Sequence, residues 1–206
     1  STFTDFGVGK GWDLGIGWEF PGVIGRPARL GELTIQDAIQ MGIGQGPIAW
    51  TPMHAANSYA TLARMGVEVP PSIIMGRAKG EPRRIGLVPE AAAEALDGLG
   101  LAVNAELGSG HYISVDGQKE PTFNHDPSRI WIWGKTGTAA GSDTSDPDGK
   151  AGPLPPETVV GDHSWYVILV GAAAERRPRF AVAVMMEYAG SGGKVSGPIC
   201  NQIVHA

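Results

Sequence analysis

The segment with the clearest chemical character is Gly134-Lys135-Thr136-Gly137-Thr138-Ala139, which follows the run Ile130-Trp131-Ile132-Trp133. The aromatic and β-branched residues of that run predict a strand. Lysine then supplies a fixed cation, two threonines supply hydroxyls, and Gly137 lets a ligand lie close to the strand edge. Such an edge can bind an extended peptide by β-addition, with Lys135 and the two threonine hydroxyls reaching a carboxylate. The alternative is a polar strand end that only leads into the next loop.

A second pattern with possible nucleophilic chemistry is Ser191-Gly192-Gly193-Lys194, the one Ser-x-x-Lys of the chain. In that chemistry the lysine takes the serine proton, which requires a helix so that residues three apart share a face. Two adjacent glycines oppose a helix. We therefore do not expect Ser191 to be a catalytic nucleophile.

Patterns for phosphate and calcium binding are incomplete. Gly134-Lys135-Thr136 imitates the end of a phosphate-binding loop, but Arg129 stands where that loop needs its first glycine. Asp146-x-Asp148-Gly149 imitates a calcium loop, yet Thr144 and Pro155 occupy its first and last ligand positions. A solvated acidic turn is the better interpretation of that loop.

Cysteine and histidine provide no metal site. Cys200 is the only cysteine, which excludes a disulfide within the chain and a cysteine-based zinc site. The five histidines fall on separate predicted elements without metal-ligand spacing: His54, His111, His125, His163 and His205. We therefore expect no bound metal.

The overall composition indicates a globular chain. With 42% apolar and 18% charged residues among 206, it can form a core and is neither disordered nor a charged helical rod. Sixteen basic against twenty-one acidic residues give a net charge of −5, which excludes a globally basic nucleic-acid binder. No apolar run is long enough to cross a membrane. The start at Ser1 reads like the middle of a longer polypeptide.

Helices are expected mainly in the first half of the chain. Thr34 is placed to cap a helix over 34–41, with Asp37 at its third position. Thr51 and Pro52 begin a helix with apolar residues at helical spacing, which Gly66 ends. A further helix is predicted over 89–104.

The second half changes to strand patterns. Strands near 129–138, 163–171 and 179–188 are predicted to form one antiparallel sheet, with the Lys135 strand at an edge facing a groove. A helix containing Pro198, Ile199 and Val204 closes the chain. Helices first and an antiparallel sheet later indicate an α+β fold.

Five landmarks occur along the chain in a characteristic order. They are Phe6-Gly7-Val8-Gly9, Gly42-Ile43-Gly44-Gln45-Gly46, Thr51-Pro52 at the start of a helix that ends Ala63-Arg64-Met65-Gly66, Gly134-Lys135-Thr136-Gly137-Thr138-Ala139, and Asp162-His163-Ser164-Trp165. Together they resemble the later part of the transpeptidase domain of penicillin-binding proteins, most of all the class B enzymes of cell elongation and division. The resemblance covers nearly the whole chain.

The resemblance implies a β-lactamase/transpeptidase-like α+β fold, an antiparallel sheet packed with helices. Residues 1–206 would be the later part of one domain, with a helical and loop layer over 1–128 and the strands with the last helix over 129–206. The family also carries a Ser-x-x-Lys with the nucleophile and a Ser-x-Asn, which would lie upstream of Ser1. It places the segment of Ser191 after the last strand, away from the nucleophile. We therefore expect this chain alone to be inactive.

The same resemblance implies roles for the site residues. Lys135 would help to place the terminal carboxylate of the substrate and set the proton balance of the site. Thr136 and Thr138 would hydrogen-bond that carboxylate across Gly137, and the backbone N–H of Thr138 would be one oxyanion-hole donor. Peptidoglycan stem peptides and β-lactams would be the ligands, without metal or organic cofactor.

The resemblance also implies a cellular setting for the full-length protein. It would act on the periplasmic face of the bacterial cytoplasmic membrane, held by an N-terminal anchor and in contact with other cell-wall or division proteins. No nucleic acid is expected as a partner.

Two alternatives share the Lys-Thr-Gly strand. One is a non-catalytic binding or scaffold relative of the transpeptidases, and the other is a serine β-lactamase or β-lactam sensor. The segment from Gly44-Gln45-Gly46 to Thr51-Pro52 favours the transpeptidase.

Overall fold

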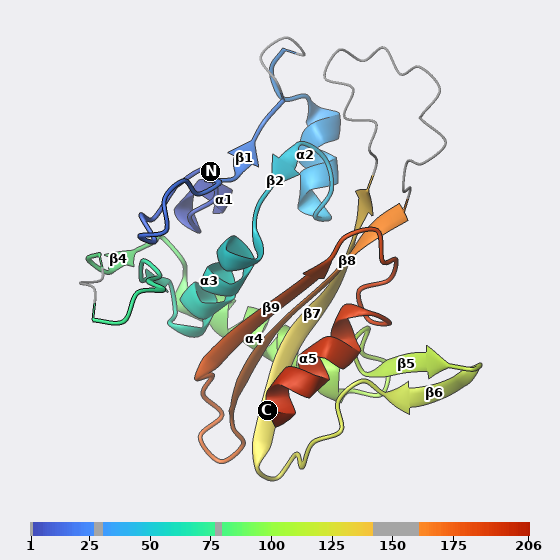
Figure 1. The fold of residues 1–206 in the computed structure, drawn as a ribbon. Coiled ribbons are helices and arrows are strands. Elements are labelled where there is room, and N and C mark those ends of the chain that lie inside the picture. Colours follow the sequence, from blue (N-terminus) through green and yellow to red (C-terminus); the bar gives the residue numbers. More distant parts are fainter. Residues whose placement is uncertain (1, 27–30, 77–79, 142–160) are drawn as a thin grey trace.

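A three-stranded antiparallel sheet forms the centre of the structure (Figure 1). The computed structural model describes residues 2–26, 31–76, 80–141 and 161–206. The strands are β7 (Ile130–Gly141), β8 (Gly161–Ala172) and β9 (Phe180–Met186), in the order β7-β8-β9. This confirms the three predicted strands and places the Lys135 strand at an edge. Pairing with β8 continues to Gly141, which extends β7 beyond its aromatic half.

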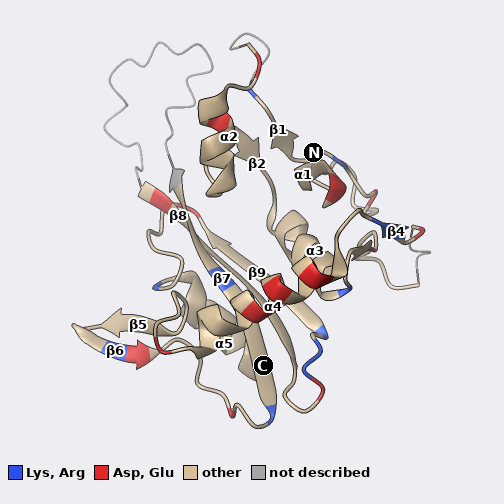
Figure 2. Cartoon of the chain, turned by 180° about the vertical axis from the view of Figure 1, so that it is seen from behind, with Lys and Arg blue, Asp and Glu red and all other residues tan. Residues whose placement is uncertain are grey.

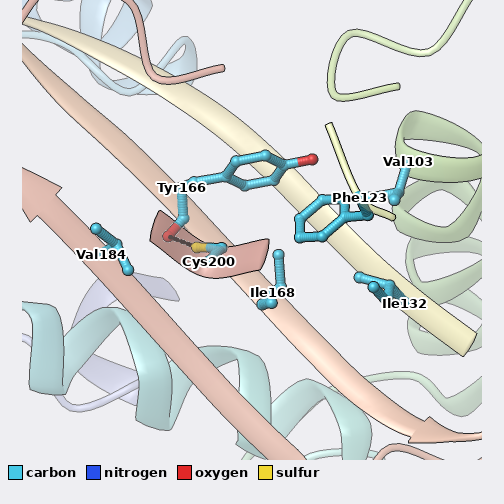
Figure 3. Packing of buried hydrophobic residues seen from close by; sticks show 7 residues of the cluster. All are labelled: Val103, Phe123, Ile132, Tyr166, Ile168, Val184 and Cys200. Atoms are coloured by element: carbon cyan, nitrogen blue, oxygen red, sulfur yellow. Dashed lines mark hydrogen bonds between the residues drawn. The ribbon is translucent and has the colours of Figure 1, made fainter. Parts of the chain in front are cut away.

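One face of the sheet is covered by α5 (Ser196–His205), the predicted C-terminal helix. Residues 132, 166, 168 and 184 alternate onto this face. The core that they form contains Val103, Phe123, Ile132, Tyr166, Ile168, Val184 and Cys200 (Figure 3). Cys200 is fully buried and free, and its burial raises the pKa of the thiol to about 12. The cysteine is therefore a core residue and not a nucleophile.

The other face of the sheet packs against α3 (Pro52–Ala63) and α4 (Pro89–Asn104), both as predicted. Leu96 of α4 meets Trp133 and Leu169, and Tyr59 and Leu62 of α3 pack around them. Because successive strand residues point to opposite faces, alternate residues of each strand contribute to the two core clusters on either side of the sheet. Figure 2 views the molecule from behind, so α4 and its acidic residues lie in front of the sheet there.

Helix starts follow the capping chemistry of the sequence. Thr34 caps α2 (Ile35–Gly42), accepting from the N–H of Asp37, whose carboxylate accepts from the Thr34 N–H at 2.7 Å. Thr51 caps α3 in the same way, with His54 as its reciprocal partner. These caps satisfy N–H groups that the helices leave open.

The N-terminal part consists of α1 (Thr2–Asp5), short strand pairs and connecting loops. β1 (Val23–Ile24) pairs with β2 (Ile48–Ala49), and β3 (Val67–Glu68) pairs with β4 (Arg83–Arg84). Fully buried Glu68 accepts hydrogen bonds from Trp12 Nε1 and Arg83 Nε, both at 3.2 Å. This carboxylate ties the loop before β1 to the β3–β4 pair.

A hairpin of β5 (Tyr112–Val115) and β6 (Gln118–Pro121) projects beside α5 in Figure 1. It was not predicted from the sequence, because Gln118–Pro121 include no β-branched or aromatic residue that would indicate a strand. The signal that could have found it is the pair Asp116-Gly117, both at positive φ, which is typical of a two-residue hairpin turn.

Two negative findings apply to the described residues. No helix among them could cross a membrane, and they hold no group of three or more metal-ligating side chains. The acidic segment Asp146-x-Asp148-Gly149 lies outside the described residues.

Candidate active site

The open edge of β7 is the first element of the site. The carbonyl oxygen of Thr136 accepts from Lys135 Nζ at 2.9 Å, and that of Thr138 accepts from Gln45 Nε2 at 2.7 Å. These carbonyls therefore point away from β8. In a strand the N–H and C=O of one residue point to the same side, so the N–H groups of Thr136 and Thr138 also face the open edge. A peptide lying along this edge can pair with them.

Side chains of the Lys-Thr-Gly segment divide between the two faces of β7. Thr136 and Thr138 lie on the α5 side and line a cavity of about 250 Å³. Lys135 lies on the side of Trp133 and α4, is exposed, and turns its ammonium back to the strand edge. The edge itself is thus the place where the lysine and the two threonines come together.

The segment after β9 forms one wall of the cavity. Ser191, Gly193 and Lys194 line it, and the N–H of Gly192 donates to Thr138 Oγ1 at 3.4 Å. A Cβ on Gly192 would meet the backbone oxygens of Gly137 and Trp165, so only glycine allows this close approach.

Ser191-x-x-Lys194 is not helical in the structure, which confirms the prediction from its glycines. The segment follows the last strand, as the resemblance implies. It lies against the Lys-Thr-Gly strand, however, and no local sequence pattern indicates that proximity. Ser164 Oγ holds it in place by donating to the Ser191 carbonyl oxygen at 3.2 Å and bonding Ser196 Oγ at 2.7 Å.

The β5–β6 hairpin forms the opposite wall. Tyr112, Ser114 and Lys119 line the cavity from this side. Lys119 Nζ lies 5.8 Å from the centroid of the Tyr112 ring, a cation–π arrangement. None of these three residues was singled out from the sequence, since the hairpin that carries them was not predicted.

A larger cavity, of about 680 Å³, lies between α4 and the first half of β7. It is lined by residues such as Leu96, Trp131 and Trp133, and Arg176 stacks 3.5 Å from the centroid of the Trp131 ring. No residue of the Lys-Thr-Gly segment lines it. The smaller cavity is the one that combines an open strand edge with hydroxyl groups and cations.

Comparison with known proteins decides the family. The model of the penicillin binding protein transpeptidase domain matches residues 1–205. The chain belongs to this family. Among curated proteins, none matches the chain.

Solved structures show the same fold. Pseudomonas aeruginosa PBP2 in complex with WCK 5153 superposes with a TM-score of 0.70 at 25% identity, covering 98% of this chain and 41% of that one. The apo transpeptidase domain of Burkholderia pseudomallei penicillin-binding protein 3 gives 0.65 at 21%, covering 98% and 54%. Mycobacterium tuberculosis PBP3 complexed with aztreonam gives 0.62 at 20%, covering 98% and 44%. The chain thus spans about half the length of these structures or less.

These matches confirm the β-lactamase-like α+β fold and the family predicted from the sequence. The roles of individual residues on β7 remain predictions.

Proposed function

We propose that this chain carries the carboxylate-binding edge of a D,D-transpeptidase that crosslinks peptidoglycan stem peptides. The observation that carries the proposal is the open edge of β7, where Lys135 and the outward-facing backbone of Thr136 and Thr138 lie beside a cavity lined by both threonines. Family membership over residues 1–205 supports the same reaction class.

In the proposed complex, the stem peptide adds to β7 as an extended strand. The hydroxyls of Thr136 and Thr138 donate hydrogen bonds to its terminal carboxylate, and the Lys135 ammonium adds a charge-assisted bond. The N–H of Thr138 donates to the oxygen of the penultimate D-alanine carbonyl, where negative charge develops. Gln45 has to release the Thr138 carbonyl oxygen, to which it donates at 2.7 Å, before a peptide N–H can pair there.

Since the one Ser-x-x-Lys of the chain, which begins at Ser191, is not helical, we propose that the nucleophile is a serine outside these 206 residues. Its Oγ attacks the penultimate D-alanine carbonyl, the peptide C–N bond breaks, and D-alanine leaves with a proton on its amine. The amine of a second stem then attacks the acyl ester, an amide forms, and the serine regains its proton.

β-Lactams are proposed to acylate the same serine and to lie along the same edge. Two of the similar structures are complexes, with WCK 5153 and with aztreonam, which supports ligand binding in relatives of this chain. From the family resemblance we also propose that the full-length protein acts outside the cytoplasmic membrane. An N-terminal anchor would hold it at that membrane, where it would contact other cell-wall or division proteins. The described residues contain no membrane-spanning helix.

The proposal is tested by peptide binding to the isolated chain. An acetylated peptide ending in D-Ala-D-Ala is titrated into ¹⁵N-labelled protein, with its C-terminal carboxamide as the matched control. We expect the amide signals of Thr136 and Thr138 to shift with the carboxylate peptide and hardly with the carboxamide. Equal shifts from both peptides, or shifts confined to residues away from β7, contradict the proposed edge. A non-catalytic binding relative would give the same shifts, and only covalent labelling of the full-length protein separates it from the enzyme.

A further inference from the structure

The cavity beside Thr136 and Thr138 has a charge opposite to that of the chain. The whole chain carries a net charge of −5. The cavity lining includes two lysines, Lys119 and Lys194, five hydroxyl-bearing serines and threonines, and no carboxylate. A concave surface that gathers cations on an acidic protein attracts anions.

Lys119 reaches this cavity from the β5–β6 hairpin, beside Ser114. Lys119 pairs with Ser114 across the hairpin, and the next residue, Glu120, pairs with Ile113. Successive strand residues point to opposite faces, so the ammonium and the carboxylate point apart. Lys119 lines the cavity, and so does Ile113, the partner of Glu120, but Glu120 itself does not.

Lys194 is fixed from the opposite wall. Its backbone N–H and that of Val195 both donate to the Ser191 carbonyl oxygen at 3.1 Å, which closes the turn against β7. The side chain itself is exposed. Within the described part of the chain, neither Lys119 nor Lys194 forms an ion pair. Both ammonium groups are therefore available to an external anion.

We propose that Lys119 and Lys194 form a second anion subsite, which binds a side-chain carboxylate of the same peptide whose C-terminus lies at Thr136 and Thr138. This inference rests on the proposed function, because the peptide must first lie along β7. An extended peptide advances about 3.3 Å per residue. The residues just before the C-terminal pair are therefore the ones nearest to the cavity that Thr136 and Thr138 line. We therefore expect a peptide with an acidic side chain at this position to bind more tightly than the same peptide with the corresponding side-chain amide.

The test uses two pairs of acetylated tetrapeptides that end in D-Ala-D-Ala. In one pair the two peptides differ in having Glu or Gln as the third residue from the C-terminus. In the other pair they differ in having Glu or Gln as the fourth residue from the C-terminus. Exposed ion pairs are weak individually, so we expect the Glu peptide of at least one pair to bind about three- to tenfold more tightly at low salt. The preference should decline at high salt because ions screen exposed charges.

Variants assign the preference to the two lysines. In the double variant Lys119→Ala/Lys194→Ala, the Glu-to-Gln affinity ratio should fall to about one. Arg177→Gln is the matched control. Arg177 is exposed in the connection between β8 and β9, and Ser164 lies toward the other end of β8. This variant should leave the Glu-to-Gln affinity ratio unchanged. Thr138→Val should weaken both peptides alike and preserve the ratio.

Each other outcome has a distinct meaning. A ratio near one in the wild type, or a ratio that survives the double variant, overturns the subsite while leaving the proposed function intact. Equal weakening of both peptides by the double variant would assign the lysines to the terminal carboxylate and also overturn it. If no peptide binds, or binding ignores Thr138→Val, the proposed function fails and the subsite fails with it.

Discussion

Replacing Lys135 with alanine separates a role in the reaction from a role in the fold. Within the described residues the Lys135 ammonium makes one hydrogen bond, to the carbonyl oxygen of Thr136 at 2.9 Å, and the side chain is exposed. Its loss should change the free energy of unfolding by less than about 0.5 kcal/mol. A hydrogen bond from an ammonium to a carboxylate is worth about 1.5–3 kcal/mol. If it acts in the transition state, acylation slows by roughly 10- to 150-fold.

The assay is the rate of acylation by a fluorescent β-lactam in the full-length protein that carries the serine. Lys135→Arg should restore the rate only in part, because a broad guanidinium does not replace a compact ammonium at a narrow edge. Arg177→Ala removes an exposed cation far from the Lys-Thr-Gly segment and serves as the control. Equal acylation rates for wild type and Lys135→Ala would refute the reasoning, and Lys135 would then be a solvated strand residue.

Two further predictions concern the isolated chain. Gly192→Ala should lower the free energy of unfolding by about 1–3 kcal/mol, because the new Cβ would meet backbone oxygens of Gly137 and Trp165. Gly98 lies in the middle of α4 with open space around it, so Gly98→Ala should instead raise the free energy of unfolding by about 0.5–1 kcal/mol. Urea unfolding measures both, and equal midpoints for the two variants would contradict the close packing. Burial lowers the pKa of His54 below its usual 6.5, against smaller opposing effects of Lys10 and Pro21 carbonyls and of Glu19. The unfolded state therefore binds the proton more tightly, and the contribution of neutral His54 to stability is present above pH 6.5 and is lost as the pH falls toward its folded pKa. Thermal melts at pH 7 and pH 5 should show a smaller decrease in His54→Gln than in wild type, and an unchanged decrease would contradict this.

Local signals were sufficient for the elements that contain them. Capping threonines located α2 and α3, and aromatic and β-branched runs located β7, β8 and β9. The five landmarks in their order along the chain were sufficient to indicate the family by resemblance. The division of Lys135 from Thr136 and Thr138 between two faces of β7 also follows from strand periodicity.

The walls of the cavity were not predicted: the hairpin wall has only a turn signal, Asp116-Gly117, and the wall around Ser191 has no local signal. Lys119 lies on β6, whose residues Gln118–Pro121 include no β-branched or aromatic side chain, and it reaches the cavity through its pairing with Ser114 of β5. Ser191 and Lys194 lie beside Thr138 because Gly192 lets the backbone pass close to Gly137, a contact between segments more than fifty residues apart. Gln45 reaches the Thr138 carbonyl across 93 positions of sequence. Such contacts depend on tertiary packing.

The central claim, that this chain supplies the binding edge and another segment supplies the nucleophile, is tested most directly by mass spectrometry after incubation with a labelled β-lactam. We predict no covalent adduct on the 206-residue chain, and a stoichiometric adduct in the full-length protein on the serine of a Ser-x-x-Lys outside it. An adduct on Ser191, abolished by Ser191→Ala, would contradict the account.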